Sequence, residues 1–368
     1  MALIVQKYGG SSLATPELIK KIAGRIVERH DSGDRLVIVV SAMGKTTNAL
    51  EAKALAVSDN PTPREMDMLI SIGERESISL MAIAVNSMRP GLAVSFTGSQ
   101  IGLITDNNHR NARILEIKGD RLVDALNGGK IPIIAGFQGV STEKEITTLG
   151  RGGSDTTAVA VAAALGADMC EIYSDVVGVY SADPGICDDP VMIKELDYDT
   201  MLTISSLGAK VLKDSAVEYA KRLGVSITTG MSWTGETGTV ISGKGSLNND
   251  KFVSLVYNDK LSYGTFGSEE VLPEDISSLR FYQKCGGSAL SVFDRSPLSG
   301  EEKCFSLAVT GSGIKSEPDK LRRMYELLSD PAPVLGFNLT DIKFEIFLKY
   351  PAETDRIRAV HSLFFDRN

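Results

Sequence analysis

Residues 2–17 have the sequence ALIVQKYGGSSLATPE. The apolar run Ala2–Val5 predicts a short strand, which leads into the glycine turn Lys7–Ser12. Thr15 and Pro16 then predict the N-cap and the first residue of an amphipathic helix. A strand, a glycine turn and a helix in this order are typical of an α/β fold, and the following part of the chain repeats the order.

The continuous apolar run Leu36–Val40 predicts a strand that is buried on both faces. We expect further strands at Ala93–Phe96, Ile131–Ala135 and Met169–Tyr173, and helices at Met66–Met81 and Thr156–Leu165. Strands that alternate with helices predict a mainly parallel sheet with helices on both faces. Ligands bind such sheets at the carboxyl ends of the strands, where the polar and glycine-rich segments of this chain lie.

The chain has 368 residues, more than the roughly 250–300 at which a single core usually stops growing. Its composition changes after Gly243. We therefore expect a large domain at residues 1–243, a polar linker at 244–250 and a smaller module at 251–368. The elements expected in the last part are strands at Phe305–Thr310 and Asp341–Leu348, a turn at Gly311–Gly313, and helices at Glu317–Leu328 and Pro351–Phe365.

Charge and composition exclude several classes of protein. Lys and Arg number 39 against 47 Asp and Glu, a net charge of −8, which argues against binding to nucleic acid or to an anionic membrane. The four cysteines form no CxxC pair and the three histidines are scattered, so we expect no metal site made by the protein alone. No segment reaches the ~18–20 apolar residues of a membrane helix, and reduced cysteines fit a cytoplasmic protein.

The turn Lys7–Ser12 is a candidate phosphate site. Gly9 and Gly10 allow backbone N–H groups to approach a phosphate closely, and the helix that follows adds a favourable dipole. Lys7 can reach a transferred phosphate as a point charge. An ordinary strand–helix turn with a surface lysine is the alternative. A P-loop at Ser41–Thr46 is excluded, because Val39 stands where that motif requires glycine.

The segment Gly150-Arg151-Gly152-Gly153-Ser154-Asp155-Thr156-Thr157 is the most informative one. Arginine matches a carboxylate bidentately, and the aspartate can orient an amine or a neighbouring lysine. A purely structural turn would not need so many polar groups beside two glycines, so we favour a functional interpretation.

Three further residues leave two interpretations open. Glu74, in an otherwise apolar helical stretch, could fix an ammonium group or form an ordinary salt bridge. Tyr180 could pack on a nucleotide base or belong to the core. Lys210 could supply a second cation for phosphates or be a solvated helix lysine.

Seven motifs in order resemble those of the aspartate kinases, in the amino acid kinase superfamily, across about residues 1–243. They are Lys7–Ser12, Ser41-Ala42 with Thr47-Asn48, Gly73–Arg75, Phe96–Gly102, Gly150–Ala158, Ser174–Pro184 and Gly208–Leu212. The resemblance implies a three-layer αβα sandwich. It also implies ATP-dependent phosphorylation of the L-aspartate β-carboxylate to 4-phospho-L-aspartate, toward lysine, methionine and threonine or a specialised branch.

The resemblance also implies a role for each site residue. On the phosphate side, Lys7 steadies the γ-phosphoryl group, Gly9 and Gly10 donate amides to it, Lys210 neutralises ATP phosphates, and Mg²⁺ bridges their oxygens. On the aspartate side, Arg151 holds the α-carboxylate within the turn that contains Gly152 and Gly153. Glu74 and Asp155 handle the α-amino group and orient neighbouring cations, and Thr47 and Ser154 contact the substrate. Ser41, Ser174, Asp175 and Tyr180 line the nucleotide side.

Residues Phe305–Phe365 resemble the last repeat of the ACT module of aspartate kinases. The first repeat should contain a D-K-P-G turn, and the sequence has none between Lys251 and Lys303. We therefore expect a shortened, α+β ACT-like module that forms a homodimer, with weak feedback by lysine or threonine. The family arginine after A-D-P is replaced by Gly185, which removes one cation from the nucleotide side.

Two alternatives to an active aspartate kinase follow from the same residues. One is a sister amino acid kinase that acts on a related acid such as acetylglutamate. The other is a catalytically degenerate paralogue that binds ligand without turnover, which only Gly185 supports.

Overall fold

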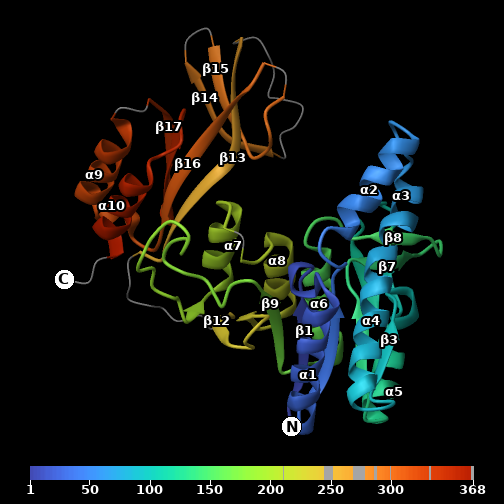
Figure 1. The fold of residues 1–368 in the computed structure, drawn as a ribbon. Helices are drawn as coiled ribbons and strands as arrows, with labels where there is room; N and C mark the ends of the chain where they lie inside the picture. The colour runs from blue at the N-terminus through green and yellow to red at the C-terminus, as the bar shows by residue number, and fades with distance from the viewer. Residues whose placement is uncertain are drawn as a thin grey trace. The chain divides into compact units, whose positions relative to one another are not determined.

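The computed structural model describes residues 1–209, 211–243, 252–267, 278–285, 288–298, 300–330 and 333–365. The described residues form two compact units (Figure 1). Unit 1 comprises Met1–Val179, Lys194–Met201 and Val211–Ser246, and unit 2 comprises Tyr180–Ile193, Leu202–Lys210 and Leu247–Asn368. The expected linker, 244–250, lies outside the described residues, and the expected boundary at residue 243 stays a prediction.

Unit 1 is built on a mainly parallel sheet of eight strands in the order β10-β12-β11-β9-β1-β2-β6-β3. The strands are β1 (Leu3–Tyr8), β2 (Arg35–Val40), β3 (Ala93–Phe96), β6 (Ile131–Ala135), β9 (Met169–Ser174), β10 (Glu195–Leu196), β11 (Ile227–Met231) and β12 (Thr237–Ile241). Only the β11–β12 pair is antiparallel within this sheet. The strands expected at Ala93–Phe96 and Ile131–Ala135 are confirmed residue for residue.

Helices cover both faces of this sheet, which confirms the expected three-layer αβα arrangement. On one face, α1 (Pro16–Asp31) packs beside α4 (Ile72–Met88), and α4 contacts β2, β3 and β6 (Figure 1). On the other face lies α6 (Gly153–Leu165), which contacts β1, β2 and β9, with α8 (Asp214–Leu223) packed on it. Helix α5 (Asp120–Asn127) contacts β6.

The alternation of side chains along β1 and β2 explains how the sheet supports two layers. Ile4, Leu36 and Ile38 belong to the apolar cluster shared with α1 and α4. Lys7 points the other way, since it pairs with Asp155 of α6. The interior strand β2 is buried at every position from Leu36 to Val40, as its continuous apolar run predicts.

Local signals in the sequence account for several helix boundaries. Thr15 caps α1 by accepting a hydrogen bond from the Leu18 N–H, and Pro16 occupies the first helical turn. The single helix expected at Met66–Met81 is wrong: α3 (Pro63–Ile70) and α4 are separate helices that meet at Ser71. Helix α6 begins at Gly153, three residues before the expected Thr156.

A second, four-stranded sheet in unit 1 has the order β5-β4-β7-β8. Its strands are β4 (Leu103–Thr105), β5 (Ile114–Ile117), β7 (Gln138–Ser141) and β8 (Ile146–Thr148). Helix α2 (Thr46–Val57) contacts α3, and α3 contacts β8. The sequence predicted none of these short strands, because three or four residues carry too little periodicity.

Unit 2 contains a six-stranded antiparallel sheet in the order β14-β15-β13-β16-β18-β17, as expected of an ACT-like α+β module. The strands are β13 (Ser254–Gly267), β14 (Leu279–Cys285), β15 (Ser288–Phe293), β16 (Glu302–Thr310), β17 (Val334–Leu339) and β18 (Lys343–Leu348). Leu307 and Ile346 of the sheet pack with Met324 of α9 (Pro318–Ser329) and Val360 of α10 (Thr354–Phe365). Every element expected between residues 305 and 365 is present, but the edge strand β17 was missed.

Helix α7 (Tyr198–Ser206) follows β10 in the chain. Among the residues that the structure describes, no helix combines the length and apolar character that spanning a membrane requires.

The core between α1 and the sheet gives a test of the packing. Ile22 lies fully inside it, whereas the neighbouring Lys21 is exposed on the same helix. We expect Ile22→Ala to lower the free energy of unfolding by about 2–5 kcal/mol, because it removes apolar contacts and leaves a cavity. Lys21→Ala is the matched control and should change it by less than about 0.5 kcal/mol. Urea denaturation followed by circular dichroism measures both, and equal midpoints would contradict the assignment of this core.

Candidate functional site

The carboxyl ends of four parallel strands meet at one edge of the large sheet. Tyr8 of β1 is in register with Val40 of β2 and with Tyr173 of β9, and Val40 is in register with Ala135 of β6. The segments that follow these strands therefore lie at the same edge. The sequence predicted the site at this edge, where open α/β sheets bind their ligands.

Lys7 and Asp155 form a largely buried ion pair at this edge. The Lys7 Nζ lies 2.6 Å from Asp155 Oδ1, and the two side chains are 12% and 11% exposed. Lys7 is on β1 and Asp155 is in the first turn of α6, so the pair joins two motifs that lie far apart in the sequence. An ammonium group has three donors, and the pair therefore fixes Lys7 while leaving N–H groups for a ligand.

The turn after β1 is held closely against the turn after β2. The Gly44 N–H donates to the Gly10 carbonyl at 2.9 Å, and the Ser41 N–H donates to the Tyr8 carbonyl at 3.1 Å. A Cβ atom on Gly10 would lie 2.6 Å from the Ala42 carbonyl oxygen, which no side chain tolerates. Glycine at position 10 is therefore required for this approach. A Cβ on Gly9 would lie 3.5 Å from the Lys7 Nζ, so Gly9 adjoins the ammonium group.

The turn before α6 depends on glycine for its backbone conformation. Gly150 and Gly152 have φ angles of 73° and 78°, in the left-handed region. Between them Arg151 is exposed, and among the described residues it has no ion-pair or hydrogen-bond partner. An unpaired guanidinium beside a helix N-terminus is suited to bind a carboxylate.

Close packing fixes the start of α6 against the end of β6. A Cβ on Gly153 would lie 3.0 Å from the Phe137 ring, and one on Gly136 would lie 2.8 Å from Ser154. The Thr157 hydroxyl donates to the Gly153 carbonyl at 2.7 Å and accepts from the Phe137 N–H at 3.2 Å. Ser154 and Asp155 are both buried in this first turn.

Glu74 is buried, with 3% of its surface exposed. Its Oε1 accepts a hydrogen bond from the Ala42 N–H at 3.1 Å, whereas its Oε2 has no partner among the described residues. Burial raises the pKa of this carboxyl to about 7, and the hydrogen bond from Ala42 opposes the shift only in part. A buried carboxylate oxygen without a donor is a site for an ammonium group.

Thr47 lies in the first turn of α2, half-buried, directly after the Ser41–Gly44 turn. Gly73, at the start of α4, adjoins the same turn, since a Cβ there would lie 2.7 Å from the Ala42 side chain. The segment after β2 is thus bordered by Gly10 on one side and by the start of α4 on the other.

Ser174 and Asp175 follow β9 at the same edge. The Ser174 carbonyl accepts from the Ser232 N–H at 2.8 Å, and the Ser232 hydroxyl lies 2.5 Å from that of Ser12. Asp175 is exposed. Ser232 links the turns after β1 and β9, but nothing in its sequence surroundings singled it out.

Two further residues were predicted to bind the nucleotide, Tyr180 and Lys210. Lys210 lies outside the described residues. Tyr180 belongs to unit 2, where it is half-buried and pairs with Met192 in an isolated bridge, and its carbonyl accepts from the Ser254 hydroxyl at 3.0 Å.

The segment that contains Tyr180 is attached to α10 within unit 2. The Ser181 hydroxyl lies 2.9 Å from His361 Nε2, and the Arg358 Nε donates to the Ile186 carbonyl at 2.9 Å. Gly185 is exposed, and its N–H donates to the Asp183 side chain at 2.8 Å.

Burial of Glu74 has a consequence for stability as a function of pH. The unfolded chain loses the Glu74 proton near pH 4.5, whereas the folded chain keeps it to about pH 7. The folded state thus binds more protons in this window, so its stability falls as the pH rises through the window. Glu74→Gln keeps an oxygen that can accept from the Ala42 N–H but cannot ionise. As the pH rises from 4.5 to 7.5, we expect its free energy of unfolding to increase by about 3 kcal/mol relative to that of the wild type.

Urea unfolding at pH 4.5 and 7.5 measures this difference. Glu76→Gln, at an exposed position of the same helix, is the matched control and should show no such gain. If the free energies of unfolding of the wild type and of Glu74→Gln differed by the same amount at both pH values, Glu74 would ionise normally in the folded protein.

Comparison with known proteins gives a consistent family assignment. The family model described as the amino acid kinase family matches residues 2–228. An aspartokinase of Mycolicibacterium smegmatis is 52% identical over 244 residues, which are 66% of this chain and 58% of that protein. The aspartokinase 2 of Bacillus subtilis is 37% identical over 399 aligned residues, which cover 99% of this chain and 97% of that protein.

Solved structures show the same fold. Escherichia coli aspartokinase III in complex with aspartate and ADP matches with a TM-score of 0.81 at 20% identity, covering 99% of this chain and 100% of that one. The aspartate kinase from Synechocystis is 32% identical, with a TM-score of 0.60 over 98% of this chain and 69% of that one. The chain belongs to the amino acid kinase family, and the relatives that it matches along nearly its whole length include aspartokinases.

Proposed function

We propose that this chain is an aspartate kinase, which transfers the γ-phosphoryl group of ATP to the β-carboxylate of L-aspartate and forms 4-phospho-L-aspartate. The observation that carries the proposal is the buried Lys7–Asp155 pair at the carboxyl edge of the sheet. The names of the relatives, and the aspartate and ADP in the E. coli complex, support it. An intact Lys7–Asp155 pair also argues against a degenerate paralogue.

The reaction needs charge neutralisation rather than a general base. A carboxylate with an ordinary pKa of about 3.9 is already ionised at pH 7, so the difficulty is to bring it up to the triphosphate. Phosphoryl transfer is accelerated mainly by positioning and by electrostatic stabilisation. Lys7 stabilises the charge on the transferred group, and Asp155 holds the Lys7 ammonium in place.

The groups assigned to aspartate have complementary charges. The unpaired Arg151 holds the α-carboxylate within the turn formed by Gly152 and Gly153, and the Glu74 oxygen without a donor receives the α-ammonium group. Thr47 and Ser154 contact the substrate through their hydroxyl groups. The two charged residues bind the α-carboxylate and the α-ammonium group of the amino acid, which leaves the β-carboxylate free to react.

The nucleotide is assigned to the neighbouring turns. Gly9 and Gly10 donate amides to the phosphates, Ser41, Ser174 and Asp175 line the same side, and Tyr180 and Lys210 complete the set by resemblance. The described residues contain no group of three metal-ligating side chains. A Mg²⁺ ion usually binds through one or two carboxylates together with substrate phosphates and water, so it fits as part of the nucleotide substrate, with the exposed Asp175 carboxylate as a candidate ligand.

The remaining proposals rest on the sequence resemblance. We propose a cytoplasmic homodimer that associates through the ACT-like module and supplies the phosphorylated intermediate for lysine, methionine and threonine. Feedback by lysine or threonine is expected to be weak, because the sequence lacks the first-repeat turn.

The activity is tested by trapping the acyl phosphate. We expect hydroxylamine to convert the product of ATP, Mg²⁺ and L-aspartate into a hydroxamate that is measured colorimetrically. N-Acetyl-L-glutamate, offered in parallel, should give none, because an acetylated amine cannot pair with Glu74. ATP binding without hydroxamate from aspartate would overturn the proposed function.

The two cations at the site should give different kinetic effects. Lys7→Ala is expected to lower kcat by about 10²–10³-fold, as the loss of one preorganised charge-stabilising donor does. Arg151→Ala should instead raise the KM for aspartate by about 10- to 100-fold, because Arg151 holds a carboxylate that does not react. Steady-state kinetics separate the two effects. A kcat for Lys7→Ala within a few-fold of the wild type would show that Lys7 has another role.

A further inference from the structure

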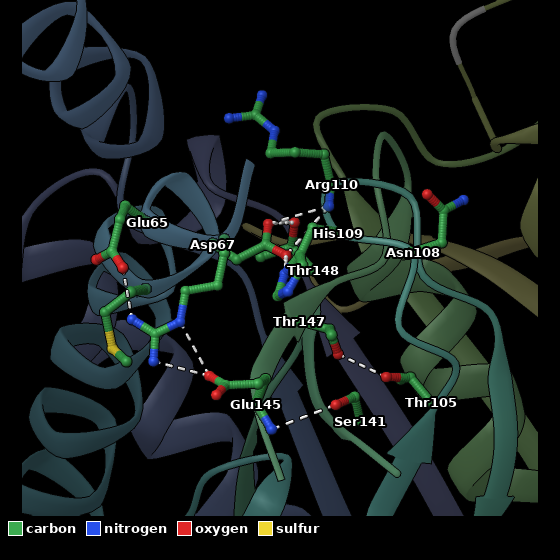
Figure 2. A network of polar contacts seen from close by, with 12 residues as sticks. Glu65, Asp67, Thr105, Asn108, His109, Arg110, Ser141, Glu145, Thr147 and Thr148 are labelled. Carbon is green, nitrogen blue, oxygen red and sulfur yellow. Dashed lines mark hydrogen bonds and ion pairs between the residues drawn. The ribbon is translucent and has the colours of Figure 1, made fainter. Parts of the chain in front are cut away.

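Asp67 of α3 is a buried carboxylate for which the proposed reaction has no use. Its residue is 0% exposed, and four contacts surround its oxygens (Figure 2). Oδ2 lies 2.7 Å from His109 Nδ1, and the Thr148 hydroxyl donates to Oδ1 at 2.6 Å. The Arg110 N–H donates to both oxygens, at 3.2 and 3.1 Å.

A carboxylate is excluded from water at a high cost unless donors surround it. An ionised carboxylate only accepts hydrogen bonds, and a His109 tautomer with its hydrogen on Nδ1 supplies the matching donor. Two of the donors come from the loop between β4 and β5 and the third from β8. Asp67 therefore ties α3 to one particular conformation of that loop.

That conformation is strained at Arg110, whose φ angle is 70°. The strained residue faces the start of the turn that contains Arg151. A Cβ on Gly150 would lie 2.9 Å from Asn111 Oδ1 and 3.2 Å from the Arg110 carbonyl oxygen. The loop is thus the surface against which Gly150 packs, one residue before Arg151.

The Arg110 side chain extends away from Asp67 in Figure 2, and its guanidinium pairs with a residue of α2. Its Nη2 lies 2.6 Å from Glu51 Oε1, and Glu51 is one turn after Thr47 on α2. Residues Thr46–Val57, all of them described, include none that is buried. The Glu51–Arg110 pair is therefore one attachment, beside the contact with α3, of a helix that has no buried residue of its own.

We propose that Asp67 is a positioning residue for the aspartate site, which sets the Thr47 helix and the Arg151 turn relative to each other through the backbone and side chain of Arg110. The inference rests on the proposed function, because that function assigns Thr47 and Arg151 to aspartate. No contact between Asp67 and the substrate is involved. In the described part of the chain, Asp67 and its partners form no hydrogen bond or ion pair with the turns after β1 and β9, so we expect a larger effect on aspartate than on ATP.

The kinetic test compares Asp67→Asn with Glu65→Gln. Both convert a carboxylate of α3 into an amide, but Glu65 is exposed, and among the described residues its side chain pairs with the neighbouring Arg64 alone. We expect Asp67→Asn to raise the KM for L-aspartate at least tenfold while the KM for ATP stays within twofold, since the amide cannot accept all four contacts. A merely structural role would reduce the folded fraction, which lowers the apparent kcat and leaves both KM values unchanged. Glu65→Gln should change neither.

Two milder variants keep the test valid if Asp67→Asn folds poorly. Thr148→Val removes one donor to Asp67 and preserves the side-chain shape, and Arg110→Gly suits the φ of 70° but removes the pair with Glu51. Both should raise the KM for aspartate by at least threefold with the thermal midpoint of unfolding close to that of the wild type. An aspartate KM within twofold of the wild type in Thr148→Val and Arg110→Gly would overturn the proposal.

Hydrogen exchange of the full chain without substrates tests the network independently of activity. In Asp67→Asn or Thr148→Val, amides of residues 108–113 and 150–153 should exchange at least tenfold faster, with α1 unchanged. Unchanged exchange in both segments would overturn the positioning role even if the enzyme phosphorylates aspartate. Faster exchange in a protein that makes no acyl phosphate would preserve the network and reject only the proposed function.

Discussion

The Lys7–Asp155 ion pair is the interaction on which the candidate site depends. It joins the central strand β1 to the first turn of α6, and both side chains are almost excluded from water. A buried pair offsets the cost of desolvation only if its geometry is kept. The sheet and α6 must therefore approach closely, and glycine supplies the space: Gly136 adjoins Ser154, and Gly153 adjoins Phe137. Cβ atoms at these two positions would move α6 outward and take Asp155 away from Lys7.

The same requirement explains the turn after β2. Gly10 and Gly73 bring two different segments to within contact of Ala42, and the Ala42 N–H is the donor that holds Glu74. The close packing thus sets the position of a charged group on each side of the edge. Lys7 is oriented through α6 on one side of the sheet, and Glu74 through the start of α4 on the other. A parallel sheet makes this possible because its strand ends, and the turns that follow, lie at one edge.

The sequence predicted those features whose cause is local. The apolar runs of β2, β3 and β6 fixed their strands, and Thr15 with Pro16 fixed the start of α1. Lys7, Arg151 and Asp155 were identified because each adjoins a glycine turn at the end of a strand or the start of a helix. Asp67 could not be found in this way, since its partners lie 42, 43 and 81 residues away and no glycine turn adjoins it in the sequence. The break at Ser71 was missed because no proline interrupts the helical pattern there, and β17 was missed because it is a strand of six residues that Gly336 interrupts.

The pairing of charges separates the groups that build the site from the groups that would bind ligand. Asp67, Asp155 and Lys7 have partners at 2.6–3.2 Å without any ligand. Arg151 and the Glu74 Oε2 have none among the described residues. Leaving a buried oxygen without a donor destabilises the folded protein, so this arrangement is explained if a ligand supplies the missing ammonium group. A guanidinium and a carboxyl left unpaired at one edge of the sheet are complementary to an amino acid, which presents an α-carboxylate and an α-ammonium group on a single carbon. In the proposed reaction, the paired residues would then determine where that carbon lies relative to Lys7, and hence which carboxylate of the substrate would reach the phosphoryl group.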